Sequence, residues 1–200
     1  MRRVGLGALL ALVASLALAD VSAASVKVKI KTVNYSISGK TGEQLLDQMD
    51  RHGPKHGFLT RAIAQTRYSI TWAIDWRERG GTCRVAAAAA ELTVTYTFPK
   101  VSGRLSPDLR RRWARFMAGV RKHEETHGRI ARQMVRAAEK SIAGLSFKKD
   151  RGCRRTRAEV KKRIDRIYSK HEARQYAFDR TEHAEGGHVE GLVMMLGVGK

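Results

Sequence analysis

The segment His123-Glu124-Glu125-Thr126-His127 has the residue types and spacing of an H-E-x-x-H metal motif. Two imidazoles four residues apart lie on one face of a helix, one turn from each other, where both can bind the same zinc ion. Glu124 lies about 100° around the helix from His123, close enough to take a proton from a water molecule held there. The motif therefore predicts metal-assisted hydrolysis, with Glu124 as the catalytic residue.

The motif lies in a segment that has the pattern of one long helix, from Leu105 to about Leu145. Ser106 and Pro107 are typical of the start of a helix, as N-cap and first-turn proline. Both histidines share one stripe with apolar residues at helical spacing, namely Leu109, Trp113, Phe116, Val120, Ile130, Met134, Ala138 and Ile142. We therefore expect the imidazoles on the face of the helix that packs against the core.

Two other interpretations of the motif are open on these grounds. A pattern with three fixed positions also arises by chance, and histidines on an apolar stripe can be ordinary core residues. The helical context and the shared face favour the metal site. A zinc site needs a third protein ligand, which must come from another part of the chain.

The first 24 residues have the composition of a signal peptide. Arg2 and Arg3 precede an apolar run from Val4 to Leu18, and small residues follow. A membrane anchor is the alternative, but the run is short for a spanning helix. We expect residues 25–200 to be one domain, secreted or periplasmic, with no transmembrane segment after cleavage and with residues 185–200 as a loose tail.

Cys83 and Cys153 are the two cysteines of the chain. An isolated pair in an oxidising compartment predicts a disulfide bond between them. Two free thiols are the alternative.

The chain is strongly basic, with 39 Lys and Arg against 19 Asp and Glu and a formal net charge of +20. The densest basic runs are Arg110–Arg112 and Lys161–Arg163. Such a surface attracts anionic partners, which for an exported protein are components of the cell envelope. Nucleic acid is not expected as a partner in that compartment. Solvated helix faces without any partner would explain the basic runs equally well.

Three segments in the N-terminal half alternate in polarity as β-strands do. They span Val26–Ser38, Arg67–Arg77 and Cys83–Phe98, and Pro99 ends the third. An alanine run at 86–90 favours helix locally, but the alternation of apolar residues with threonines after it favours a strand.

A second long helix is predicted from about Thr156, which has Glu159 three residues later as in a capping box. Two helices joined by a short loop usually pack antiparallel. This places residues 171–179 level with the H-E-x-x-H motif. The predicted fold is α+β, a small antiparallel β-sheet packed with two long antiparallel helices, in a zincin-like arrangement.

The extended zinc-protease pattern H-E-x-x-H-x-x-G-x-x-H is absent. Ile130 stands where the pattern requires glycine, and Gln133 stands where it requires the third histidine. The third ligand must therefore come from the second helix or from the residues just after it.

The chain resembles a bacterial family catalogued as a domain of unknown function and described as secreted zinc-dependent proteases. The resemblance covers nearly the whole mature chain and ends with the pattern Tyr-Asp-x-x-Thr-x-His-Gly. Residues 178–184 correspond to it with Phe178 for tyrosine, Ala184 for glycine and one residue fewer between Asp179 and Thr181. It also rests on the export signal, Tyr35, Gly39, Trp72, Cys83, Pro99, the H-E-x-x-H-G segment and Cys153. The resemblance implies a zincin-like peptidase that acts on peptides or proteins.

The closing motif of this family implies His183 or Asp179 as the third ligand. The positions of residues along the second helix, relative to the motif on the first, favour Asp179 or Glu172. The predicted zinc ligands are His123, His127 and His183, with Asp179 as the alternative to His183. The alternative function is a non-catalytic protein that binds the cell envelope, with a structural metal site and a basic binding surface.

Overall fold

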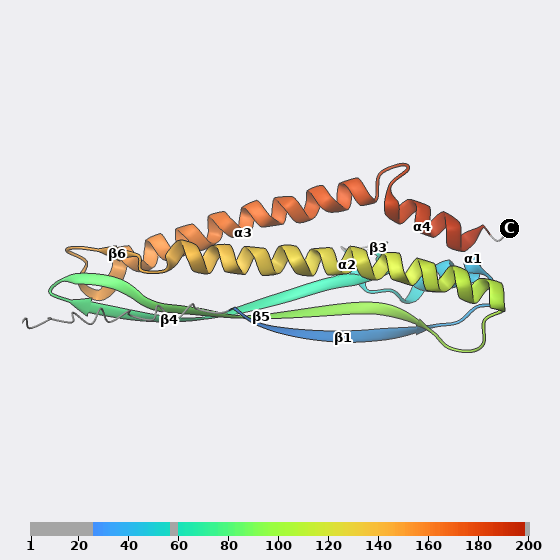
Figure 1. The fold of residues 1–200 in the computed structure, drawn as a ribbon, viewed down its shortest axis with the longest axis horizontal. Helices are drawn as coiled ribbons and strands as arrows, with labels where there is room; N and C mark the ends of the chain where they lie inside the picture. Colours follow the sequence, from blue (N-terminus) through green and yellow to red (C-terminus); the bar gives the residue numbers. More distant parts are fainter. Residues whose placement is uncertain (1–25, 57–59, 199–200) are drawn as a thin grey trace, which may run out of the picture.

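The computed structural model describes residues 26–56 and 60–198. A four-stranded sheet lies under two long helices, and the molecule is elongated along their axes (Figure 1). The predicted α+β class is therefore confirmed. The expected signal peptide, residues 1–24, lies outside the described residues. No helix in the described part of the chain is both long and apolar enough to cross a membrane.

The centre of the sheet is β5 (Thr82–Val101), which pairs with β1 (Lys27–Ile37), with β4 (Gln65–Arg79) and with the two-residue β6 (Ser146–Phe147). The alanine run belongs to β5 because it pairs in register with residues 72–75 of β4. Cross-strand pairing thus outweighs the helix preference of alanine.

The sheet is mixed, which corrects the prediction of an antiparallel sheet. β4 and β5 form an antiparallel hairpin, but β1 runs parallel to β5 along its other edge. A parallel pair needs a long crossover connection. Here α1 (Gly42–His52), the short strands β2 (Lys55–His56) and β3 (Thr60–Arg61), and β4 itself separate β1 from β5.

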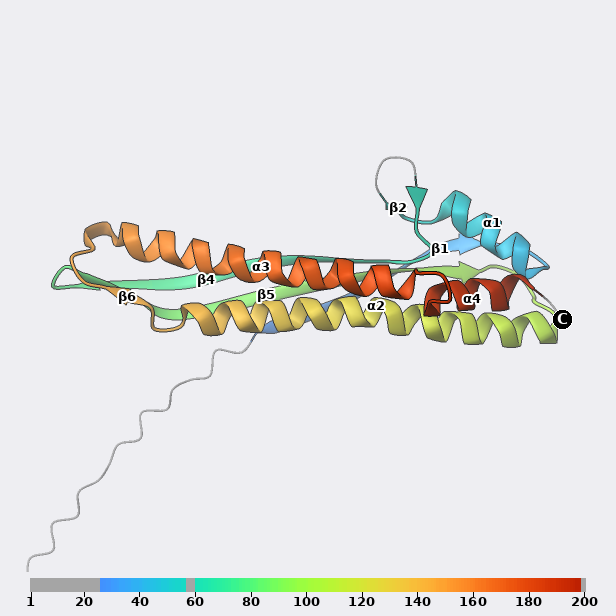
Figure 2. The same ribbon diagram turned by 90° about the horizontal axis from the view of Figure 1, so that it is seen from above.

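The two long helices are α2 (Pro107–Ile142) and α3 (Arg154–Glu182), and they lie side by side over one face of the sheet (Figure 2). Ser106 caps α2 as predicted, since its hydroxyl accepts a hydrogen bond from the amide of Leu109. The main core lies between α2 and the sheet and includes Leu92, Val94, Tyr96, Phe98, Phe116, Val120 and Met134.

The start of α3 differs from the predicted capping box. Thr156 lies inside the helix, and its hydroxyl donates to the carboxylate of Asp150 at 2.6 Å. The same carboxylate accepts hydrogen bonds from the amides of Arg155 and Thr156. Asp150 therefore satisfies the first amides of the helix, a role that the sequence pattern assigned to Thr156.

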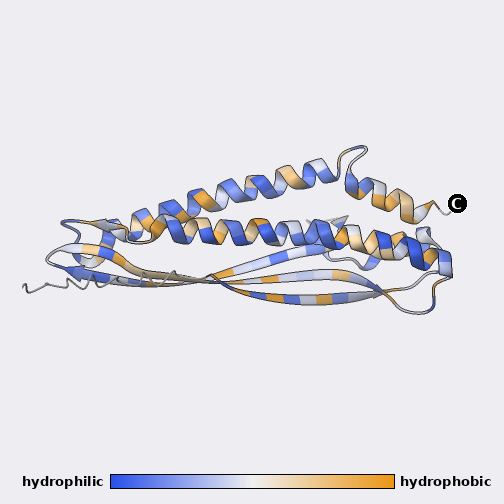
Figure 3. Cartoon of the chain, viewed as in Figure 1, coloured by the Kyte–Doolittle hydropathy of each residue, from blue (hydrophilic) through white to orange (hydrophobic). Residues whose placement is uncertain are grey.

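The C-terminal residues are not a loose tail, which corrects that prediction for residues 188–197. They form α4 (His188–Gly197), a mostly hydrophobic helix in Figure 3. Val189, Leu192 and Leu196 of α4 are buried, because their spacing forms one apolar face. That face packs closely on α2: a Cβ atom at Gly119 would lie 2.4 Å from the side chain of Leu192.

Cys83 and Cys153 form a disulfide bond, as predicted, with their Cα atoms 5.2 Å apart. The bond joins the start of β5 to the residue before α3. The two half-cystines are 70 residues apart, so the chain-entropy model gives about 4 kcal/mol of stabilisation through restriction of the unfolded chain.

We therefore expect reduction to lower the free energy of unfolding by about 4 kcal/mol. Urea unfolding with and without a reductant, followed by circular dichroism, measures the difference. As a control, alkylation of the denatured, unreduced protein should add no mass. Uptake of two alkyl groups would show that the cysteines are free.

Candidate metal centre

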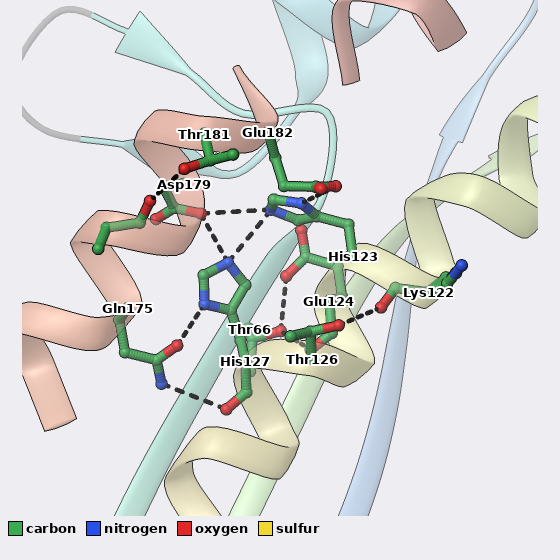
Figure 4. Close-up of polar contacts among 11 residues, drawn as sticks. Thr66, Lys122, His123, Glu124, Thr126, His127, Gln175, Asp179, Thr181 and Glu182 are labelled. Carbon is green, nitrogen blue, oxygen red and sulfur yellow. Dashed lines mark hydrogen bonds and ion pairs between the residues drawn. The ribbon is translucent and has the colours of Figure 1, made fainter. Parts of the chain in front are cut away.

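His123 and His127 lie on the face of α2 that is turned toward α3. Their Nε2 atoms are 3.2 Å apart, and His123 is only 7% exposed. The spacing of the motif therefore does what the sequence predicts: it directs two imidazole nitrogens of one helix toward a common point (Figure 4).

Asp179 of α3 directs a carboxylate oxygen toward the same point (Figure 4). Its Oδ1 atom is 2.8 Å from Nε2 of His127 and 3.4 Å from Nε2 of His123. Ligand atoms of a tetrahedral zinc ion are about 3.3 Å apart, since each lies about 2.0–2.1 Å from the metal. The separations of these three atoms are thus close to those of a zinc site.

His183, at the C-terminal end of α3, lies at the same centre. Its ring is edge-on to that of His123, with 5.3 Å between the centroids. His123, Asp179 and His183 each offer a ligand atom, and these atoms all lie within 4.8 Å of one another. The predicted third ligand and its alternative are therefore both beside the two histidines of the motif.

Gln175 of α3 sets the orientation of His127. Its Oε1 accepts a hydrogen bond from Nδ1 of His127 at 2.6 Å, and its amide group donates to the backbone oxygen of His127 at 3.2 Å. The proton of the neutral imidazole is then on Nδ1, which leaves a lone pair on Nε2. Gln175 was missed by the sequence analysis, although it precedes Asp179 by one helical turn.

The lone pair of His127 faces a second acceptor, the Oδ1 atom of Asp179, at 2.8 Å. Converging acceptors repel one another unless a proton or a cation lies among them. Burial opposes the imidazolium, but hydrogen bonds to Asp179 and Gln175 outweigh burial and raise the pKa of His127. At Asp179 burial favours the neutral acid. The hydrogen bonds and charges of the two imidazoles outweigh burial and lower the pKa of Asp179. The donor set therefore fits a positively charged occupant.

Glu124 is buried beside this centre and is held by β4. The hydroxyl of Thr66 donates to its Oε2 atom at 2.5 Å (Figure 4). Burial raises the pKa of Glu124, and the hydrogen bond from Thr66 partly offsets this. No local pattern singles out Thr66, because only the packing of β4 against α2 brings it to the motif.

Two close contacts fix the position of the motif. The ring of Phe178 stacks on His123 at 4.9 Å and meets His127 edge-on at 5.2 Å, so the residue that replaces tyrosine packs the imidazoles and supplies no phenol. Gly128 follows the motif where α2 passes β5, and a Cβ atom there would lie 2.0 Å from the hydroxyl of Tyr96. Glycine is needed at this position for the close approach.

A cleft with a volume of about 920 Å³ opens beside the centre. His123, Glu124, His127, Asp179 and His183 all contribute to its wall. Its lining also has apolar and aromatic side chains from β4, from the segment just before it and from the three C-terminal helices, including Ile63, Tyr68, Val120, Tyr176, Val189 and Val193. The cleft is large enough for a short segment of an extended chain.

Residues 32–188 match the model of a family described as "Bacterial protein of unknown function (DUF922)". The match includes every residue of the centre, from Thr66 to His183. No curated protein and no solved structure matches the chain. Since the match spans well over half of the sequence, this protein is a member of the DUF922 family of bacterial proteins of unknown function.

Proposed function

We propose that this protein is an exported zinc-dependent metallopeptidase. The observation that carries the proposal is the convergence of two imidazole nitrogens and a carboxylate oxygen beside a buried glutamate, all in the wall of one cleft. This is the constellation that metal-assisted hydrolysis requires: a metal with three protein ligands, an adjacent base and room for a substrate.

The proposed ligands are His123, His127 and Asp179. The choice of Asp179 over His183 rests on distance, since Oδ1 of Asp179 lies within 3.4 Å of both Nε2 atoms of the motif. His183 is then a neighbour of the ligands, with its ring edge-on to that of His123. Three protein ligands leave a fourth position for water or for the carbonyl of a substrate.

Zinc at this centre would make bound water acidic and would polarise a peptide carbonyl. Glu124 would take the proton from the attacking water and deliver it to the departing amine. Thr66 holds the carboxylate of Glu124 in place, and the hydrogen bond to Gln175 would leave the Nε2 lone pair of His127 available to a metal. Phe178 and the buried side of the cleft keep solvent away from the imidazoles.

The proposal of export rests on two features of the chain. Its first 24 residues have the pattern of a signal peptide. The disulfide between Cys83 and Cys153 is typical of an oxidising compartment. The proposed location is the periplasm or the medium.

Metal analysis combined with a peptidase assay tests the proposal. We expect purified residues 25–200 to contain one zinc ion per chain and to cleave an unstructured protein such as casein. A chelator should stop cleavage and added zinc should restore it. Only a trace of zinc in the unmutated protein would rule out the metallopeptidase. Stoichiometric zinc without hydrolysis of any peptide would instead indicate a structural metal in a binding protein.

A further inference from the structure

A groove on another flank of α2 carries uncompensated positive charge. It has a volume of about 660 Å³ and lies between α2, the end of β1 and the segment that joins β5 to α2. Lys100, Arg104, Arg110 and Arg121 line it, and none of its lining residues is acidic. Arg121 and His123 are about 200° apart around the helix, so this basic groove faces away from the metal centre.

The arginines of the basic groove differ from their immediate neighbours in having no acidic partner. Arg111 and Arg112 form ion pairs with Asp108 at 3.2 and 3.0 Å. Across residues 26–56 and 60–198, none of the four cations of the basic groove takes part in an ion pair. The groove therefore keeps the positive charge of these four side chains.

Two of the groove arginines are already held in place. The guanidinium carbon of Arg121 lies 4.5 Å from the centre of the Phe98 ring. Arg110 donates a hydrogen bond from Nη2 to the backbone oxygen of Leu105 at 3.3 Å. Side chains that are ordered in advance lose less conformational entropy when a ligand binds. The basic groove is therefore partly preorganised for an anionic ligand.

The spacing of these arginines indicates the size of the ligand. Arg110 and Arg121 lie on one face of α2, about 16 Å apart along its axis. A single small anion cannot reach both, whereas a chain with repeated anionic groups can. Arginine suits phosphate because its planar fork offers paired donors. The indole of Trp113 also lines the groove and packs against Phe116, with 5.5 Å between ring centroids.

We propose that the basic groove binds an extended phosphate polymer of the cell envelope, held by Lys100, Arg104, Arg110 and Arg121. This site is separate from the metal centre and shares no lining residue with the cleft. It would keep the protein at an anionic surface whether or not the metal centre hydrolyses peptides.

The test is binding of inorganic polyphosphate to residues 25–200, measured by fluorescence anisotropy over a series of salt concentrations. The double change Arg110→Gln and Arg121→Gln should weaken binding at least tenfold and should flatten the dependence of log Kd on log salt by about one for each arginine. The control is Arg136→Gln with Arg166→Gln, two exposed arginines on α2 and α3 that do not line the groove. It removes the same charge and should change Kd less than threefold.

An equal loss in both double variants would show diffuse attraction to a basic protein and would overturn the proposal. So would full competition by orthophosphate at the same concentration of phosphate groups, because that result indicates a site for a single anion. Tighter binding of poly-L-glutamate than of polyphosphate would assign the groove to acidic proteins instead. Unchanged melting temperatures in both variants would establish that a loss of binding is not a loss of fold.

Discussion

Replacement of Glu124 by glutamine should abolish peptide hydrolysis while the zinc content and the fold are retained. Glutamine has the shape of glutamate and can still accept a hydrogen bond from Thr66 through its amide oxygen. It cannot take a proton from water. Loss of a general base lowers the rate by about 10²–10⁴-fold, so we expect kcat to decrease by at least two orders of magnitude.

The adjacent residue of the motif offers a matched control. Glu125 is exposed, and Glu125→Gln makes the same chemical change one position along the helix. This variant should keep kcat within about twofold of the parent, since exposed surface substitutions rarely matter. Metal analysis and circular dichroism of both variants complete the comparison.

Two outcomes would contradict the assigned role of Glu124. If Glu124→Gln retains kcat within a few-fold, the residue is not the base, although the metal could still be catalytic. If both glutamine variants lose activity equally, the loss comes from removing negative charge anywhere in the motif. It then does not depend on the buried carboxylate of Glu124 in particular. A non-catalytic envelope-binding protein would show no hydrolysis in the parent and no response to either change.

Asp179→Ala should weaken zinc binding more than any other single change on α3. Its Oδ1 atom lies within 3.4 Å of both Nε2 atoms of the motif. Without it, two histidines of one helix are left, and two protein ligands do not hold zinc well against water. We expect an affinity loss well above the roughly 10–100-fold that follows from loss of a residue that only orients a ligand.

His183→Ala is the informative comparison, because His183 is the third ligand predicted from the closing motif. If His183 only supports the centre, its loss should cost about 10–100-fold in zinc affinity. Competition titration with a chromophoric chelator measures both variants on one scale. Glu185→Gln, an exposed acidic residue just beyond α3, serves as the control and should leave the affinity unchanged.

The reverse order of effects would identify His183 as the third ligand. If both variants bind zinc as tightly as the parent, the ligand set is wrong, and Glu172, which also lines the cleft, becomes the next candidate. Melting temperatures of the variants distinguish each of these results from a failure to fold.

Sequence by itself determined those parts of the protein in which a pattern repeats within one element. The stripe of α2, its cap at Ser106 and the shared face of His123 and His127 follow from helical periodicity alone. The pairing of Cys83 with Cys153 follows from their number. The approach of Asp179 to the motif follows from antiparallel packing of two helices joined by a short loop.

Only the tertiary structure decided the features that depend on contacts between distant segments. The parallel pairing of β1 with β5, the packing of α4 on Gly119 and the hydrogen bond from Thr66 to Glu124 leave no local signature in the chain. The alanine run is a strand because β4 pairs with it, and Asp150 replaces the expected cap because the loop folds back on α3. Local periodicity can place a side chain on a face of its element. Which atoms that face meets depends on free energies of packing and pairing that are shared among residues far apart in sequence.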